Sequence, residues 1–515
     1  MNTILSDNNS TPFLVEQISR YEAAPRRCSV VVVGGGLAGL ELIKELAHWG
    51  VTDVLLVEAG PAEDMRHANW AYPPDVALKL WLAPETDKYF RQPWRSLRPP
   101  SYTESSGIRQ RLGGRSLYWY GVSLPIEPTA LTEPWWPKSV VTDLRHSWRD
   151  GPALYTRVLR QLATWKTEGE SELADPEMTW RLGELELRRT PRAIRHNADL
   201  TRWRAYSPLD CFKENDGNRG GGSPIPLLTS TQALSIRFSG RNACGVSVRD
   251  SVTEEIYDID ADHVVLAAGT IENTRLAAQA LFETGAIEAP RLNGLSDHLV
   301  QGIFVRLPKD SGSRLIASIG NGSYFVAGGA HDRSNLFLDI QENETDGTVL
   351  VDLQMTGEQL RSDSNYIELG RPYSDRRIEI NSSLSPEDQM VLSAQRSVLQ
   401  ETWDHLAQLV GLVAVRLEFG DFSAPKRTNS LVFPESIRQI ALGVPTTWSG
   451  VLGTEDHEGG TLPFGTVLND QQEFNAVSCL YVVGPAAFPR MGSANPSLTT
   501  LALAHRLAAI LADRA

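Results

Sequence analysis

A glycine-rich segment between a predicted strand and a predicted helix constrains the fold more than any other part of this 515-residue sequence. An apolar run, Val30 to Val33, leads into the pattern G-x-G-x-x-G, formed by Gly34, Gly36 and Gly39. In this pattern the first glycine permits a tight turn, the second lets the backbone approach a pyrophosphate, and the third lets the helix pack closely on the strand. The segment therefore predicts a dinucleotide-binding β–turn–α unit. A tight turn that binds no nucleotide is the alternative.

A second predicted strand strengthens this interpretation. The segment VTDVLLVEAG follows the helix and contains Glu58, about 20 residues beyond the glycines, where a carboxylate accepts hydrogen bonds from a ribose. Strand, glycines, helix, strand and acid stand in the order that a mononucleotide-binding unit requires. The pattern by itself does not distinguish FAD from NAD.

Composition excludes several classes of protein. The net charge of −14 argues against a general nucleic-acid binder, because neutralising phosphates requires clustered Lys and Arg. The four cysteines (Cys28, Cys211, Cys244 and Cys479) form no C-x-x-C pair, so we expect reduced thiols, no disulfide framework and no metal site. No signal peptide and no apolar run of about 18 residues is found, so we expect a cytoplasmic protein without a membrane span. The sequence indicates no oligomeric state.

The remaining chain suggests a discontinuous nucleotide domain. Leu227 to Val248 alternates in the manner of paired strands, and His263 to Leu281 predicts a second strand–turn–helix unit. Near the end, CLYVVG predicts a strand, and Asn495-Pro496 begins a closing helix. Residues 127–205 are predicted to be mostly helical, with a helix from Val140 to Trp165. Residues 302–444 alternate between strand-like runs and polar turns, which predicts a mostly antiparallel sheet with covering helices.

We therefore expect an α/β fold, with a Rossmann-type nucleotide-binding domain and a second, substrate-binding domain built on a mostly antiparallel sheet with helices. Residues 1–27 are interpreted as an N-terminal lead-in. Residues 28–140, 205–300 and 445–515 are assigned to the first domain, and residues 141–204 and 301–444 to the second. The functional site is expected between the domains, where pockets tend to form.

Three further segments contain candidate site residues. RLGGRSLYWYG, from Arg111 to Gly121, can bring backbone and aromatic faces close to a flat ligand, or it can be a plain turn before a strand. His457 stands in a glycine-flanked segment, where an ordinary loop histidine is the alternative. Asn495 precedes the closing helix, a place from which side chains project into sites.

Taken together, these segments resemble the glucose–methanol–choline (GMC) flavoprotein oxidoreductases along nearly the whole chain. The similar segments are the N-terminal glycine pattern with Glu58, GGRSLYWYG, HVVLAAGTIENTRL, NGLSDHL, HEGGT and VVGPAAFPRMGSANPSLTTLALAHR. Members of this family bind FAD in a split Rossmann-type domain, and a separate sheet domain holds the substrate over the isoalloxazine ring.

The resemblance implies the roles of individual residues. His457 matches the family's general base, and Asn495 matches its second active-site position. The residues implied to bind FAD are Gly34, Gly36, Leu37, Ala38, Gly39, Glu58, Arg111, Gly113, Gly114, Ser116, Ala233, Leu234, Ala268, Gly269, Gly484, Asn495, Pro496 and Ser497. Tyr118 stands where pyranose oxidase carries a flavin-linked histidine, so we predict non-covalent FAD. Leu462, Pro463 and Phe464 replace the Cys-Arg-Met of many members, which leaves substrate contacts there open.

The implied reaction is oxidation of a CH–OH group to a carbonyl, by hydride transfer to flavin N5 with His457 as the base. The closing segment looks most like pyranose oxidases and bacterial sugar or C-glycoside 3-oxidases, so the expected substrate is a secondary hydroxyl of a pyranose or glycoside. The expected electron acceptor is oxygen or a quinone. The alternatives are a tailoring alcohol oxidase or dehydrogenase of secondary metabolism and the flavin subunit of a multi-subunit dehydrogenase.

Overall fold

The structure of the chain is a computed structural model. It describes residues 13–18, 23–104, 106–167, 178–199, 201–214, 224–326, 333–343, 346–373, 377–420 and 439–514. Most of the predicted lead-in, residues 1–12 and 19–22, lies outside the described residues.

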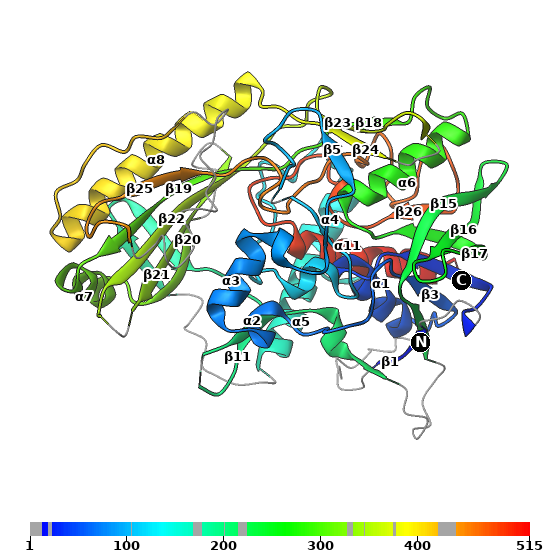
Figure 1. Cartoon of the computed structure of the whole chain (residues 1–515), viewed down its shortest axis with the longest axis horizontal. Helices are drawn as coiled ribbons and strands as arrows, with labels where there is room; N and C mark the ends of the chain where they lie inside the picture. Colours follow the sequence, from blue (N-terminus) through cyan, green and yellow to red (C-terminus); the bar gives the residue numbers. More distant parts are fainter. Residues whose placement is uncertain are drawn as a thin grey trace.

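A nine-stranded sheet forms the centre of one part of the molecule, on the right in Figure 1. Its main path runs β13 (Phe212–Glu214), β1 (Phe13–Ile18), β14 (Ile225–Leu228), β3 (Val54–Val57), β2 (Arg27–Val33), β17 (Ile256–Leu266), β16 (Asn242–Asp250) and β15 (Thr231–Ser239), and β26 (Leu480–Val482) pairs with β17. The strands from β13 to β17 pair in parallel, as does β26, whereas β15, β16 and β17 form an antiparallel meander. The parallel strands are apolar because helices and loops bury both of their faces.

The strand–turn–helix units predicted from the sequence are confirmed. β2 leads through the glycine turn into α1 (Leu37–His48), and β17 leads into α6 (Thr270–Glu283). β26 precedes the closing helix α11 (Ser497–Ala512), which lies beside α1 (Figure 1). At Gly39 a Cβ atom would stand 2.0 Å from the carbonyl oxygen of Gly34, so only glycine allows α1 to pack this closely on the turn.

A seven-stranded sheet forms the centre of the other part of the molecule, on the left in Figure 1. Its order is β25 (Thr446–Ser449), β19 (His298–Leu307), β22 (Val349–Glu358), β21 (Ser334–Glu342), β20 (Gly322–Val326), β10 (Leu185–Arg189) and β9 (Thr179–Leu182). Every neighbouring pair is antiparallel, which confirms the predicted α/β fold class with a second, antiparallel sheet.

The two faces of this sheet have different environments. Leu338, Leu353 and their alternating neighbours share a buried core with Trp403 of α8 (Pro386–Val410) and Leu315 of α7 (Lys309–Ser318). α8 lies along this covered side of the sheet (Figure 1). It begins with a capping box between Ser385 and Asp388. Alternate residues of each strand point to the opposite face of the sheet, which α8 does not cover.

The prediction that residues 127–205 are mostly helical is wrong in two places. A hairpin of β7 (Ser147–Trp148) and β8 (Gly151–Pro152) divides the predicted helix into α4 (Lys138–Arg145) and α5 (Leu154–Thr167). Arg149 and Asp150 adopt φ angles of 47° and 58°, which a helix does not allow. Farther on, β9, β10, β11 (Ile194–His196) and β12 (Trp203–Ala205) are strands. Burial of Leu182 and Leu187 in the second core outweighs local helix propensity there.

A smaller sheet contains β18 (Arg291–Asn293), β23 (Tyr366–Leu369), β24 (Ile378–Asn381) and β5 (Trp94–Ser96). The helices α4 and α5 pack against α11 and bury their apolar side chains in the first core. The division of the chain into domains stays a prediction, and this packing places α5 next to the nucleotide-binding elements.

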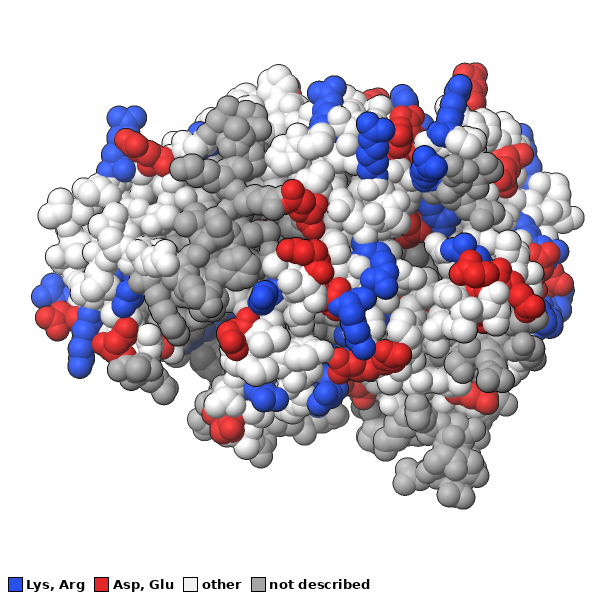
Figure 2. Space-filling model, in the orientation of Figure 1, with Lys and Arg blue, Asp and Glu red and all other residues white. Residues whose placement is uncertain are grey.

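The described charged side chains are interspersed on the face shown in Figure 2, with acidic and basic groups alternating over most of it. Within the described residues, no helix combines the length and the apolar character needed to cross a membrane.

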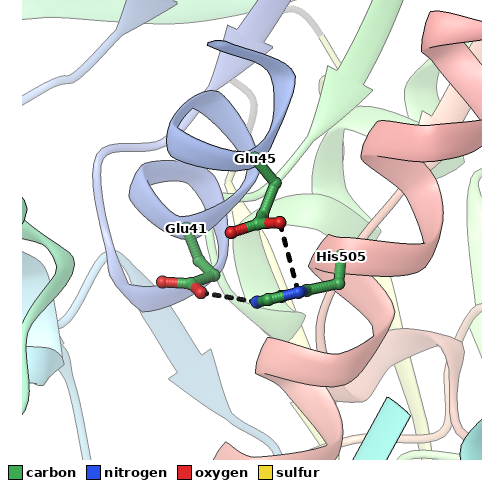
Figure 3. Close-up of side chains that lie close together, drawn as sticks. All are labelled: Glu41, Glu45 and His505. Carbon is green, nitrogen blue, oxygen red and sulfur yellow. Dashed lines mark hydrogen bonds and ion pairs between the residues drawn. The ribbon is translucent and has the colours of Figure 1, made fainter. Parts of the chain in front are cut away.

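A buried group of charges joins α1 to α11 (Figure 3). The Nζ atom of Lys44 lies 2.6 Å from Oε1 of Glu41, and Nε2 of His505 lies 2.8 Å from the same oxygen. The Nδ1 atom of His505 lies 3.2 Å from Glu45, and the Tyr206 hydroxyl donates to Oε2 of Glu41 at 2.8 Å. The Glu41, Glu45 and His505 ligand atoms lie within 4.8 Å of one another, but Lys44 already supplies a cation to the carboxylates. We therefore describe this group as an ion-pair network.

We expect Glu41→Gln to lower the stability of the protein by about 3–5 kcal/mol, because it leaves the buried Lys44 without its closest counter-charge. Burial raises the pKa of Glu41, but the charges of Lys44 and His505 outweigh it and hold the pKa well below its usual range. The carboxylate therefore stabilises the fold above the unfolded-state pKa of about 4.3, and this contribution is lost as the pH falls. Thermal unfolding from pH 7 to pH 3 measures the difference.

The control for this prediction is Asp262→Asn, which removes the exposed ion pair between Arg27 and Asp262, whose side chains are 68% and 53% exposed. An exposed pair contributes less than about 1 kcal/mol. Equal losses in the two variants would show that the buried network does not stabilise the fold more than a surface pair.

Candidate functional site

A cavity of about 430 Å³ extends from the glycine turn to His457. It lies at the carboxyl ends of β2, β3, β17 and β26, where open parallel sheets bind their ligands. The predicted site residues that line it are Gly34, Gly36, Leu37, Ala38, Glu58, Gly114, Ser116, Ala233, Ala268, Gly269, Gly484, Pro496, Ser497 and His457. The cavity therefore brings together residues from most of the segments that the sequence analysis selected.

The glycine turn has room for a phosphate group. Gly36, directly before α1, has φ −87° and ψ −163°, an extended conformation that any residue adopts. A Cβ atom added there would meet no protein atom within 4 Å and would point into open space. Nothing in the protein itself requires glycine at this position, whereas a pyrophosphate that approaches the backbone requires it. The N–H groups of the first turn of α1 supply donors for such an anion.

Glu58 follows the last residue of β3, as predicted. Its Oε2 accepts a hydrogen bond from the Gly35 N–H at 2.8 Å, and its Oε1 accepts one from the Gly60 N–H at 2.7 Å. Burial raises the pKa of Glu58 to about 7, although both hydrogen bonds oppose this shift. Each oxygen keeps lone pairs that can accept from ribose hydroxyls, so the position fits the nucleotide end of FAD.

Five predicted site residues do not line the cavity. Gly39 lies beneath the turn, and Leu234 has its carbonyl bonded to the Arg275 guanidinium at 3.1 Å. Arg111 donates to the Glu63 carbonyl and to the Tyr118 hydroxyl, and the Gly113 N–H donates to the Gly35 carbonyl at 2.7 Å. The fifth, Asn495, contacts His457.

Arg275 and Arg115 also line the cavity, although neither was predicted as a site residue. Arg275 of α6 holds β15 against the cavity through bonds to the carbonyls of Ala233 and Leu234 at 2.9 and 3.1 Å. Arg115 donates to Oε1 of Glu458 at 2.6 Å and pairs with Asp456 at 3.0 Å, so it joins the GGRSLYWYG loop to the residues around His457. Spacing along the sequence could not reveal these contacts, because the carbonyls that Arg275 binds and the acids that Arg115 binds lie 41 or more positions away.

His457 and Asn495 meet at the end of the cavity that faces the antiparallel sheet. The Nε2 atom of His457 lies 3.3 Å from Nδ2 of Asn495, and its Nδ1 atom lies 2.9 Å from Nδ1 of His298. Burial lowers the pKa of His457 well below its ordinary value, and the neighbouring His298 and Arg115 act in the same direction. The imidazole is therefore neutral near pH 7 and able to accept a proton. His298 was not predicted as a site residue, although it lies within the segment NGLSDHL that carries part of the family resemblance.

The uncovered face of the antiparallel sheet carries acidic side chains. Asp339 of β21 and Asp352 of β22 are directly opposite in the register, and both alternate with residues of the covered core. Burial raises the pKa of Asp352 well above its usual range, and the charges of Asp339 and Glu455 raise it further. Glu455 lines the cavity two residues before His457. This face therefore carries carboxyl groups that lie near enough to the cavity for the charge of Glu455 to act on Asp352, and a carboxyl group can accept hydrogen bonds whether it is protonated or ionised.

Comparison with known proteins agrees with this geometry. Residues 361–504 match the GMC oxidoreductase family, in the part that forms its C-terminal domain. The fold is similar to that of pyridoxine 4-oxidase from Mesorbium loti, with a TM-score of 0.58 and 15% identity over 94% of this chain and 99% of that chain. Formate oxidase gives a TM-score of 0.58 and 15% identity over 95% of this chain and 99% of that chain. No curated protein sequence matches the chain.

A point variant of formate oxidase from Aspergillus oryzae, studied for the effect of the mutation on FAD modification, gives a TM-score of 0.58 and 15% identity over 95% of this chain and 99% of that chain. At this level of identity, the similarity establishes the fold, and the family match adds the C-terminal domain. The cavity, with its open glycine turn and its histidine, fits FAD. Residues 361–504 are therefore similar to the C-terminal domain of GMC oxidoreductases, and the chain has the fold of these two oxidases.

Proposed function

We propose that the protein oxidises a secondary hydroxyl of a pyranose sugar or a glycoside to a ketone, and that oxygen or a quinone accepts the electrons. The observation that carries this proposal is that Glu455, whose charge acts on Asp352 of the acidic sheet face, lines the same cavity as His457. A base alone suits any alcohol, whereas several carboxyl groups near it suit a substrate with several hydroxyls.

FAD, when bound, supplies the acceptor for the hydride that leaves the C–H bond. Gly36 and the first turn of α1 hold its pyrophosphate, and Glu58 holds the ribose of its nucleotide end. The Nε2 atom of His457 accepts the hydroxyl proton of the substrate. The Asn495 amide orients the substrate oxygen and donates to it as negative charge develops. Asp339 and Asp352 accept hydrogen bonds from the other hydroxyls and position the ring.

FAD is proposed to bind without a covalent link. Tyr118 packs with Ala77 and Leu117 in a small core and does not line the cavity. Among the described lining residues, His457 is the sole histidine. We expect acid precipitation of the purified protein to leave the yellow cofactor in the supernatant. Flavin that stays with the precipitated chain would contradict this binding mode.

We also propose that the protein acts in the cytoplasm. All four cysteines are free thiols, which is the state that a reducing compartment maintains.

The substrate is tested by recording the visible spectrum anaerobically while glucose, xylose and several O- and C-glycosides are added in turn. Bleaching of the oxidised flavin by one of these compounds supports the proposal, and the rate at which air restores the colour separates an oxidase from a dehydrogenase. If none of them bleaches it, the sugar assignment is wrong and the substrate is another alcohol.

Asp352→Ala tests the role of the acidic face, because it removes the carboxyl group whether that group is ionised or protonated. We expect it to weaken the apparent affinity for the sugar about tenfold, or ~1.4 kcal/mol, while FAD content stays normal. Glu342→Ala is the matched control, because it removes an exposed carboxylate at the end of β21. Unchanged affinity in Asp352→Ala would show that this face does not bind the substrate.

A further inference from the structure

We propose that His298 is a positioning residue that fixes the tautomer of His457, with the proton on Nδ1 and the lone pair on Nε2. This inference rests on the proposed role of His457 as the base. The tautomer follows from a series of hydrogen bonds whose direction is set at a backbone carbonyl.

The first link is the contact between His298 and Gly492. The Nε2 atom of His298 lies 3.0 Å from the Gly492 carbonyl oxygen. A carbonyl oxygen has only lone pairs to offer, so Nε2 of His298 must carry a hydrogen. His298 is therefore either the Nε2–H tautomer or an imidazolium.

The second link depends on His298 being neutral. His298 is 2% exposed, and burial lowers its pKa to about 4, although the bond to Gly492 opposes the shift. Above pH 5 the ring is neutral, so Nδ1 has a lone pair. His457 Nδ1 lies 2.9 Å away and must donate to it. The proton of neutral His457 is thereby assigned to Nδ1.

The third link leaves the reactive atom of His457 free of a proton. Because Nδ1 holds the hydrogen, Nε2 has the lone pair, and it faces the Asn495 amide nitrogen at 3.3 Å. Before substrate binds, an Asn495 N–H therefore donates to this single lone pair. A bound substrate hydroxyl takes the place of that N–H, and the Asn495 amide then donates to the substrate oxygen. The opposite tautomer would place a hydrogen there and abolish the base.

The backbone around the Gly492 carbonyl is fixed by further hydrogen bonds. The Gly492 N–H donates to Oε1 of Glu358 at 3.1 Å, and the Ser493 N–H donates to Oε1 of Glu127 at 2.9 Å. The Asn335 amide donates to the Ser493 carbonyl at 3.0 Å. Since the strands and helices of the fold fix these partners, the direction of the chain is set by the framework before any substrate binds.

These hydrogen bonds also limit where the proton taken from the substrate can go. After Nε2 accepts it, His457 is an imidazolium whose Nδ1–H still donates to His298. His298 holds its own hydrogen against a carbonyl that does not release a proton onward, so the chain ends at Gly492. The proton must therefore leave from Nε2 on the cavity side. His298 is a fixed acceptor and not part of a proton wire.

The deciding experiment is ¹⁵N NMR of the FAD-loaded protein with labelled histidine, with the His457 signals assigned by their loss in His457→Ala. We expect neutral His457 to carry its proton on Nδ1 from pH 6 to pH 8. An Nε2–H tautomer in the unaltered protein overturns the proposal, whatever the variants do. This measurement needs no substrate, so it stays decisive even if His457 proves not to be the base.

Two variants test the cause. His298→Leu removes the acceptor, so we expect the Nε2–H tautomer to appear and flavin reduction by the active sugar to fall about 100-fold, with FAD retained. His298→Asn keeps a side-chain oxygen near the position of Nδ1 and should restore much of the Nδ1–H tautomer and of the rate. His263→Leu, outside the cavity, is the control. If His298→Leu keeps both the tautomer and the rate of the unaltered protein, His298 does not position His457.

Discussion

His457→Ala is expected to slow flavin reduction by substrate by roughly two to four orders of magnitude while the protein stays yellow. The variant loses the group that accepts the hydroxyl proton but keeps the glycine turn, Glu58 and the rest of the cofactor cavity. Anaerobic stopped-flow absorbance measures the reduction rate, and the spectrum of the purified protein reports the bound FAD. His263→Ala serves as the control, because His263 contacts Tyr481 away from the cavity.

The pH dependence of the unaltered enzyme provides a second test of this role. Because burial lowers the pKa of His457 well below its ordinary value, the imidazole remains neutral down through pH 6. The rate of flavin reduction should therefore stay level from pH 8 to pH 6 and fall only at lower pH, as the ring becomes protonated. A near-normal rate of flavin reduction in His457→Ala would show that His457 is not the base.

Gly36→Val is expected to weaken FAD binding about 100-fold, or ~2.7 kcal/mol, without unfolding the protein. The extended backbone at Gly36 accepts a side chain, and the new methyl groups would point into the space that the pyrophosphate needs. FAD titration of the apoprotein measures the affinity, and thermal unfolding of the apoprotein measures the fold.

Gly420→Val is the matched control, since a Cβ atom at this exposed position also meets no atom within 4 Å. We expect it to bind FAD normally. Full FAD occupancy in Gly36→Val would show that the pyrophosphate does not approach this backbone. A large loss of apoprotein stability would instead show that glycine is required by the fold itself.

Local sequence determined the nucleotide-binding elements. The turn at Gly34, the close packing at Gly39 and the acid at Glu58 each depend on a few neighbouring residues, so their spacing predicted them before any long-range contact was known. The antiparallel second sheet was also predictable, because alternation along each strand reflects burial of one face. The family resemblance then selected His457 and Asn495, which are 38 positions apart and hydrogen-bonded in the structure.

Tertiary structure decided the features that no local pattern encodes. The break between α4 and α5 and the strands that follow depend on burial in cores assembled from distant segments. The position of Arg115 beside Glu458 depends on a contact across 343 positions.

The sequence by itself specified which residues can turn, pack and accept protons, because these are properties of single side chains and short spacings. Only the tertiary structure decided which nitrogen of His457 holds the proton. That choice is made by His298, which contacts His457, and by the Gly492 carbonyl, which contacts His298; they lie 159 and 35 positions from His457 along the chain, and only the fold brings the three together. A hydrogen bond has a direction, and the direction of this chain is set by distant backbone that the fold brings into place.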